Sequence, residues 1–178
     1  MSRINALTEI TASPEAKEIF ANLKKSLGKV PNVYATMAHS PATLKGMLAY
    51  GVALKKGVFS SKEVEAIGLA VGQENNCNYC LAAHTLMGKG AGWSEEETHS
   101  IRLGNPADKK IKALTDLARE IVRSKGLPAQ ESIDAFLAAG YNQAALVELI
   151  AWVAHNIFTN YFNHIAETEV DFPPAKEI

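Results

Sequence analysis

The sequence has little cysteine and no excess of either charge. Among its 178 residues there are two cysteines, and 18 lysines and arginines stand against 19 aspartates and glutamates. Proteins that bind nucleic acid usually carry a basic surplus, so we expect no nucleic-acid partner. The first residues, MSRINALTEI, show no secretory pattern. Because of this we expect a cytoplasmic protein, in which the two cysteines form no structural disulfide. In such a reducing compartment a Cys-x-x-Cys pair is typical of redox chemistry or metal binding.

Long apolar runs and strand patterns are also missing. The longest strongly apolar segment, AALVELIAWVA, has 11 residues and includes Glu148. That is too short to cross a membrane, so no membrane partner is expected. We find no segment with a period of two, no low-complexity tract and no linker. A chain of this length buries a core that needs no disulfide or metal for stability. These features predict a single all-α domain over residues 1–178.

Helix start and stop signals occur along most of the chain. Segment 13–28 opens with Ser-Pro and ends in glycine, the pattern of a capped helix. The capping-box spacing Ser-x-x-Glu begins at Ser60 and again at Ser94. Segment 107–126 is amphipathic. A last helix is expected from about residue 143 to residue 167, before Phe-Pro-Pro stops regular structure.

Both cysteines lie in the stretch QENNCNYCLAAH. Asn75 and Asn76 are expected to cap a helix that continues to the glycines near residue 90. On this helix Cys77 and Cys80 are three positions apart, and Cys80 and His84 are four apart. Both spacings bring side chains onto one face, with Cβ atoms roughly 5–6 Å apart. The two cysteines can therefore form a disulfide with little movement.

Two arguments disagree about which thiol attacks a substrate. His84 lies within reach of Cys80 but nearly two turns from Cys77, which favours Cys80. A helix N-terminus lowers the pKa of a first-turn thiol, which favours Cys77. The residues alone leave this choice open.

Glu65 is the one charged residue in the apolar run VEAIGLAVG. A lone carboxylate in such a helix is expected to be partly buried. Burial would raise its pKa and make it a usable base near neutral pH. The alternative is that Glu65 lies on a narrow solvent-exposed stripe or pairs with a lysine.

The combination of these residues resembles a known signature. Glu65, eleven intervening residues and then Cys77-x-x-Cys80-x-x-x-His84 is similar to the motif of AhpD-like alkylhydroperoxidases, in the carboxymuconolactone decarboxylase superfamily. The tail NYFNHIAETEVDFP resembles the end of the peroxidase-related members. The resemblance implies an AhpD-like helical bundle that assembles as a homo-trimer or homo-hexamer.

The resemblance also implies a division of the chain and a mechanism. The motif core would span about residues 40–125, and the C-terminal helix about residues 143–167. Cys80 would attack hydrogen peroxide or a small organic hydroperoxide and become a sulfenic acid, which Cys77 would resolve as a disulfide. Glu65 and His84 would relay protons. An external thiol or dithiol would restore the pair, and no cofactor or metal is required.

Three further residues are candidates for indirect contact with the site. The chain has Tyr79 where the best-known family member has a histidine, and we expect this tyrosine to shape the pocket or donate one hydrogen bond. Asn156, Asn160 and Asn163 form a polar stripe on the last helix. Because buried amides need partners, the stripe is expected to face another helix, a subunit or the pocket edge. Asn160 and Asn163 are the candidates to support the site, whereas His155 is assigned to polar packing.

Parts of the pattern also fit different functions. Cys77, Cys80, His84 and Glu65 could in principle offer metal ligands, but structural zinc sites usually draw ligand pairs from separate elements, and no second pair exists. A decarboxylase or lactone-opening enzyme could share the fold, although two thiols at this spacing favour redox chemistry. A disulfide protein without peroxidase activity, or a binding module whose cysteines are merely buried, would also fit the composition.

Overall fold

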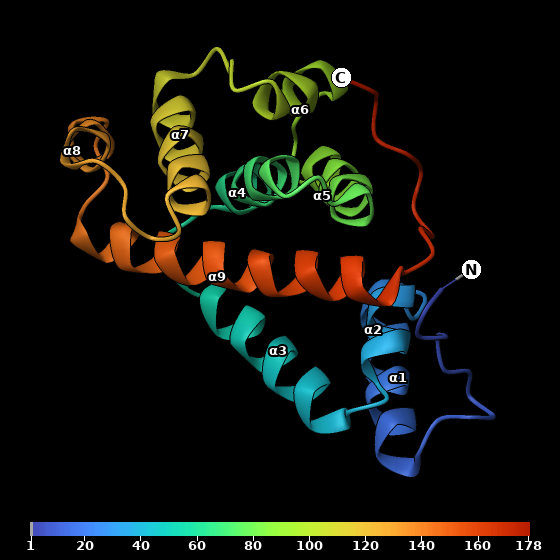
Figure 1. Cartoon of the computed structure of the whole chain (residues 1–178). Coiled ribbons are helices and arrows are strands. Elements are labelled where there is room, and N and C mark those ends of the chain that lie inside the picture. Colours follow the sequence, from blue (N-terminus) through green and yellow to red (C-terminus); the bar gives the residue numbers. More distant parts are fainter. Residues whose placement is uncertain (1) are drawn as a thin grey trace.

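The computed structural model describes residues 2–178, and this part of the chain contains nine helices and no strand (Figure 1). The all-α prediction is therefore confirmed. The helices are α1 (Pro14–Leu27), α2 (Asn32–Met37), α3 (Pro41–Leu54), α4 (Ser61–Glu74), α5 (Asn78–Gly90), α6 (Glu95–Arg102), α7 (Lys109–Arg123), α8 (Gln130–Ala138) and α9 (Gln143–Ala166).

The expected start and stop signals act at the helix ends. The Ser13 side chain accepts a hydrogen bond from the first turn of α1, and Gly28 ends that helix with a left-handed φ of 76°. Both halves of the capping box form at Ser60, before α4, and at Ser94, before α6. These local bonds satisfy backbone N–H groups that a helix leaves free, so the boundaries follow from the sequence itself.

Helix α4 is the centre of the molecule. It packs against α5, α6, α7 and α9, and every residue from Val64 to Gly72 is buried. In Figure 1, α4 and α5 lie side by side above α9, while α3 crosses on the other side of α9. A helix that is apolar on nearly all sides must be surrounded, which explains why the motif helix pair lies in the interior.

Two large apolar clusters make up most of the core. The first joins α4 with α7, α8 and α9 around residues such as Ile67, Phe136 and Leu149. The second joins α1, α2 and α3, and it includes Cys77 and Cys80. The cysteine pair is therefore part of a packed core and not an exposed loop.

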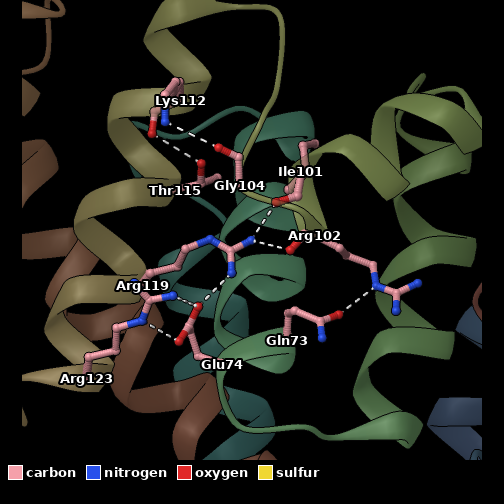
Figure 2. Close-up of polar contacts among 9 residues, drawn as sticks. All are labelled: Gln73, Glu74, Ile101, Arg102, Gly104, Lys112, Thr115, Arg119 and Arg123. Carbon is pink, nitrogen blue, oxygen red and sulfur yellow. Dashed lines mark hydrogen bonds and ion pairs between the residues drawn. The ribbon is translucent and has the colours of Figure 1, made fainter. Parts of the chain in front are cut away.

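An arginine–glutamate network fixes the end of α4, just before the cysteines (Figure 2). Glu74 accepts hydrogen bonds from Arg119 at 2.8 Å and from Arg123 at 2.6 and 2.7 Å. Arg119 also donates to the main-chain carbonyls of Ile101 and Arg102. Burial opposes ionisation of Glu74, yet the hydrogen bonds from Arg123 and Arg119 hold its pKa below the ordinary value. The network ties α4 to both α6 and α7.

Among residues 2–178, no single helix has the length and apolar character needed to cross a membrane. Helices α8 and α9 meet that requirement only as a pair, and they are bent by 119° where they join.

Candidate active site

The turn between α4 and α5 places the first cysteine at a helix start. Asn75 ends α4, Asn76 has a left-handed φ of 54°, and Cys77 is the N-cap of α5. The prediction that the asparagines cap the cysteine helix was therefore wrong. The chain needs two residues to turn between the packed helices, and asparagine tolerates the left-handed conformation.

The two cysteines form a disulfide in this structure. Their Cα atoms are 5.3 Å apart, and the Cys80 N–H donates a hydrogen bond to the Cys77 sulfur at 3.3 Å. Cys77 is 1% exposed and Cys80 is 4% exposed. The expected pairing distance is thus confirmed, and the structure shows the oxidised form of the pair.

Glu65 and His84 form a buried pair between α4 and α5. The His84 Nδ1 and Glu65 Oε2 atoms are 2.7 Å apart, and the side chains are 16% and 11% exposed. The expected burial of Glu65 is confirmed, so the solvent-stripe alternative is wrong. Gly68 makes room for the imidazole, since a Cβ at that position would lie 2.4 Å from two atoms of the His84 ring.

A cavity of about 120 Å³ joins this pair to the disulfide. Its lining includes Glu65, His84 and Cys80, whereas Cys77 does not contribute to the lining described. A water molecule occupies about 30 Å³ of liquid, so the cavity has room for a small molecule. Cys80, the His84 imidazole and the Glu65 carboxylate therefore line the same partly open space.

Helix α9 supplies the opposite wall, as its asparagine stripe indicated. The Asn163 Nδ2–H donates to the Cys80 sulfur at 3.4 Å, and the Asn75 side chain donates to Asn160 Oδ1 at 2.8 Å. Asn160 and Asn163 are both buried, as is Asn156 on the same helix. Asn163 therefore contacts the site directly, while Asn160 holds the turn that precedes Cys77.

His155 also lines the cavity. The sequence pattern indicated polar packing for this residue and did not identify it as a cavity residue. Burial, with smaller effects of His84 and Lys55, lowers the pKa of His155 to about 4, so its imidazole is neutral at physiological pH. The spacing of polar residues on this helix was a signal for this position. His155 and Asn156 lie four and three residues before Thr159, and Thr159 lies four residues before Asn163, so these side chains gather on one side of the helix.

Tyr34 is a further cavity residue, and sequence reasoning missed it. Burial, together with the nearby Glu65 carboxylate, raises the pKa of Tyr34. Nothing in the short segment between Pro31 and Pro41 marks this tyrosine, because the packing of α2 against the motif helices is a tertiary property.

Tyr79 makes a contact of a different kind from a proton relay. Its hydroxyl donates to Asp171 at 2.8 Å and accepts from the Val33 N–H at 3.1 Å, and its ring packs edge-on against Phe172. Burial raises the pKa of Tyr79 well above its ordinary value. Its bonds tie the segment after α9 to the first turn of α5.

The donor set does not resemble a metal centre. In the part of the chain that the structure describes, no group of three or more histidine, cysteine or acidic side chains is arranged to hold a metal ion. The fold and the site together define an all-α protein with a buried Cys-x-x-Cys disulfide beside an imidazole–carboxylate pair.

Comparison with known proteins shows what the chain is similar to. Residues 41–108 match the model of the carboxymuconolactone decarboxylase family, and a search of curated proteins finds no match. A peroxidase-related protein with an alkylhydroperoxidase AhpD core, from Ralstonia eutropha, is 20% identical with a TM-score of 0.86, covering 96% of this chain and 92% of its own. A peroxidase-related protein from a Silicibacter species is 21% identical, with a TM-score of 0.81 and coverage of 97% and 92%.

The debrominase Bmp8, in complex with 2,3,4-tribromopyrrole, has the same fold. It is 16% identical with a TM-score of 0.81, and the match covers 96% of this chain and 92% of that one. The family match includes both cysteines, Glu65 and His84, and the fold match extends over almost the whole chain. Residues 41–108 are thus similar to the carboxymuconolactone decarboxylase family, and the fold of almost the whole chain is that of AhpD-like proteins.

Proposed function

We propose that the protein is a thiol-dependent peroxidase that reduces hydrogen peroxide or small organic hydroperoxides. The observation that carries this proposal is the shared cavity, which is lined by Cys80 together with the His84–Glu65 pair. Reductive cleavage of an O–O bond needs a thiolate, a second thiol and a proton donor. These groups are all present within two adjacent helices.

The first half of the reaction oxidises Cys80. Its thiolate attacks one peroxide oxygen, so that an S–O bond forms while the O–O bond breaks. The leaving oxygen takes a proton from His84, which Glu65 orients through the 2.7 Å contact, and departs as alcohol or water. Cys80 is then a sulfenic acid, and the peroxide has accepted two electrons.

The second half closes the disulfide and then reopens it. The Cys77 thiol gives up its proton and its sulfur attacks the Cys80 sulfur, so that an S–S bond forms while the S–O bond breaks and the sulfenic OH leaves with that proton as water. The product is the Cys77–Cys80 bond of this structure. An external dithiol returns both cysteines to thiols by two exchange steps and itself becomes a disulfide. We place this chemistry in the cytoplasm, whose reductants maintain such a cycle.

The assignment of Cys80 as the attacking residue rests on access. Cys80 lines the cavity, whereas Cys77 caps the helix outside it. We expect one equivalent of peroxide to give a sulfenic acid on Cys80 in Cys77→Ser, detected by a dimedone-type probe and mass spectrometry. Trapping on Cys77 in Cys80→Ser at equal or greater speed would reverse the roles.

The fold alone does not select this reaction, because the same architecture also houses a debrominase. The decisive experiment is peroxide consumption with a dithiol reductant, run beside Cys77→Ser and Cys80→Ser. We expect turnover in the natural sequence and its loss in both variants. A decarboxylase or lactone-opening activity on this fold would survive the loss of the thiols. Absence of peroxide turnover in the natural sequence, with a disulfide that the dithiol reduces, would leave a redox protein of another kind.

A further inference from the structure

The two sulfurs have different hydrogen-bond donors. The Cys77 sulfur accepts the Cys80 main-chain N–H at 3.3 Å, which belongs to the free N–H groups at the start of α5. The Cys80 sulfur accepts the side-chain N–H of Asn163 at 3.4 Å, which comes from α9. The donor to the Cys77 sulfur therefore belongs to α5 itself, whereas the donor to the Cys80 sulfur is a residue 83 positions further along the chain.

Packing alone does not explain why an asparagine occupies position 163. The residue is 5% exposed, and its Oδ1 is buried without a hydrogen-bond partner in residues 2–178. A buried unpaired oxygen destabilises a fold, and a leucine of similar size would avoid it. The orientation with Nδ2 toward the sulfur is the one that forms a bond, since a disulfide sulfur has no proton to give to Oδ1.

We propose that Asn163 is a positioning residue that stabilises the Cys80 thiolate and so selects Cys80, not Cys77, as the nucleophile. When the disulfide is reduced, the Asn163 N–H donates to a full negative charge instead of a neutral sulfur. Hydrogen bonds to charged groups are stronger than bonds between neutral ones. The inference deepens the proposed function, on which it rests for the role of Cys80.

The test measures each thiol by itself. In Cys77→Ser the rate of Cys80 alkylation by iodoacetamide is followed against pH, with and without Asn163→Leu. We expect Asn163→Leu to raise the apparent pKa of Cys80 by roughly one to two pH units, the effect of losing a hydrogen bond to a charged group. The apparent pKa of Cys77, measured the same way in Cys80→Ser, should stay within experimental error.

This pair of measurements separates positioning from a structural effect. Other titratable groups around the cavity belong to several elements, and all of them are present in both backgrounds. They are Tyr34, Lys55, Glu65, Tyr79, His84 and His155. A general loosening of the fold would shift both thiols, whereas the loss of the Asn163 bond shifts one.

The outcomes are distinct. An unchanged Cys80 profile, or equal shifts of both thiols, would overturn the proposal. If Asn163→Leu does not fold, as judged by circular dichroism, Asn163→Ala is measured in its place with the same two expectations. Thr115→Val, which alters a buried side chain bonded only within α7, is the control and should move neither thiol. Because alkylation needs no peroxide, a protein without peroxidase activity can still confirm the role of Asn163.

Discussion

At the scale of single residues, the Glu65–His84 contact is expected to have a large effect on the rate of peroxide turnover. Glu65→Gln keeps the size of the side chain but removes the carboxylate that orients His84 at 2.7 Å. General acid–base groups typically contribute ~10²–10⁴-fold. We therefore expect peroxide turnover and Cys80 alkylation to fall by roughly 10²-fold or more while circular dichroism is unchanged.

The control for Glu65→Gln is Glu15→Gln, which removes a carboxylate from an exposed ion pair with Lys45. It should leave both rates unaltered. Wild-type rates in Glu65→Gln across the pH range would reduce Glu65 to a packing residue and remove a main support of the proposed function.

Gly68 gives a second test at this scale, because its substitution moves the His84 ring without replacing any titratable residue. Gly68→Ala places a Cβ 2.4 Å from the His84 Cε1 and Nδ1 atoms, so the imidazole must turn away from Glu65. We expect a loss of turnover at least tenfold, since misplacing a catalytic group by about 1 Å can cost 10²-fold.

Gly46→Ala is the matched control, since it is also a helical glycine and its added Cβ meets nothing within 4 Å. It should keep full activity and gain roughly 0.5–1 kcal/mol of stability, the usual difference between these residues in a helix. Equal activities of the two variants would show that the His84 position does not matter.

At the scale of elements, the network at the end of α4 holds the cysteine turn in place. Glu74→Gln leaves the Arg119 guanidinium, whose side chain is 7% exposed, without its carboxylate partner. We expect a loss of about 2–4 kcal/mol in the free energy of unfolding, measured by urea denaturation at pH 7. Asp116→Asn breaks an exposed pair with Lys112 and should change stability by less than about 1 kcal/mol.

The same network predicts a pH dependence with a definite sign. The pKa of Glu74 is lower in the folded protein than its ordinary value of 4.5. Its contribution to stability is therefore present above about pH 4.5 and is lost as pH falls through the folded value. The stability difference between the natural sequence and Glu74→Gln should shrink toward acid pH, and a difference that grows there would contradict this account.

The secondary-structure elements were the part of the molecule that the sequence predicted best. The helices follow from local signals, namely caps at Ser13, Ser60 and Ser94 and apolar spacing, and local signals can be read without the fold. The turn before Cys77 was assigned wrongly because asparagine suits both a cap and a left-handed turn, and only the packing of α4 on α5 decides between them.

The residues of the candidate site that are close together in the sequence could be found from the sequence, whereas those that tertiary packing brings to the cavity could not. Cys77, Cys80 and His84 share one short stretch, and Glu65 stands out as a lone charge in an apolar helix. His155 and Tyr34 reach the cavity from helices far away in the chain, and their position depends on tertiary packing that a single sequence does not show.

At the scale of the whole molecule, several large apolar side chains of α3 and α9 are exposed. Exposed apolar side chains follow α3 and the outer side of α9: Tyr50, Val52, Val147, Ile150, Phe158, Tyr161 and Ile165. A groove of about 380 Å³ runs between these two helices. Exposed apolar side chains gathered on neighbouring helices are typical of contact sites.

We therefore expect a homo-oligomer, as the family resemblance implies, with a mass of three or six times 19.2 kDa. Multi-angle light scattering at micromolar concentration measures it directly. Phe158→Glu should lower the mass by adding a charge to the contact face, and Lys45→Glu, on the exposed surface of α3, is the matched control. A mass near 19.2 kDa for the natural sequence would contradict the expectation.

The contact between Cys80 and Asn163 has a consequence for the chain during its own synthesis. The two residues are 83 positions apart, and at typical rates of 5–20 residues per second Cys80 is made roughly 4–17 s before Asn163. Throughout that interval the cysteine helix lacks the α9 wall of its cavity. A chain interrupted before α9 therefore keeps Cys77, Cys80, Glu65 and His84 but lacks the Asn163 donor to the Cys80 sulfur.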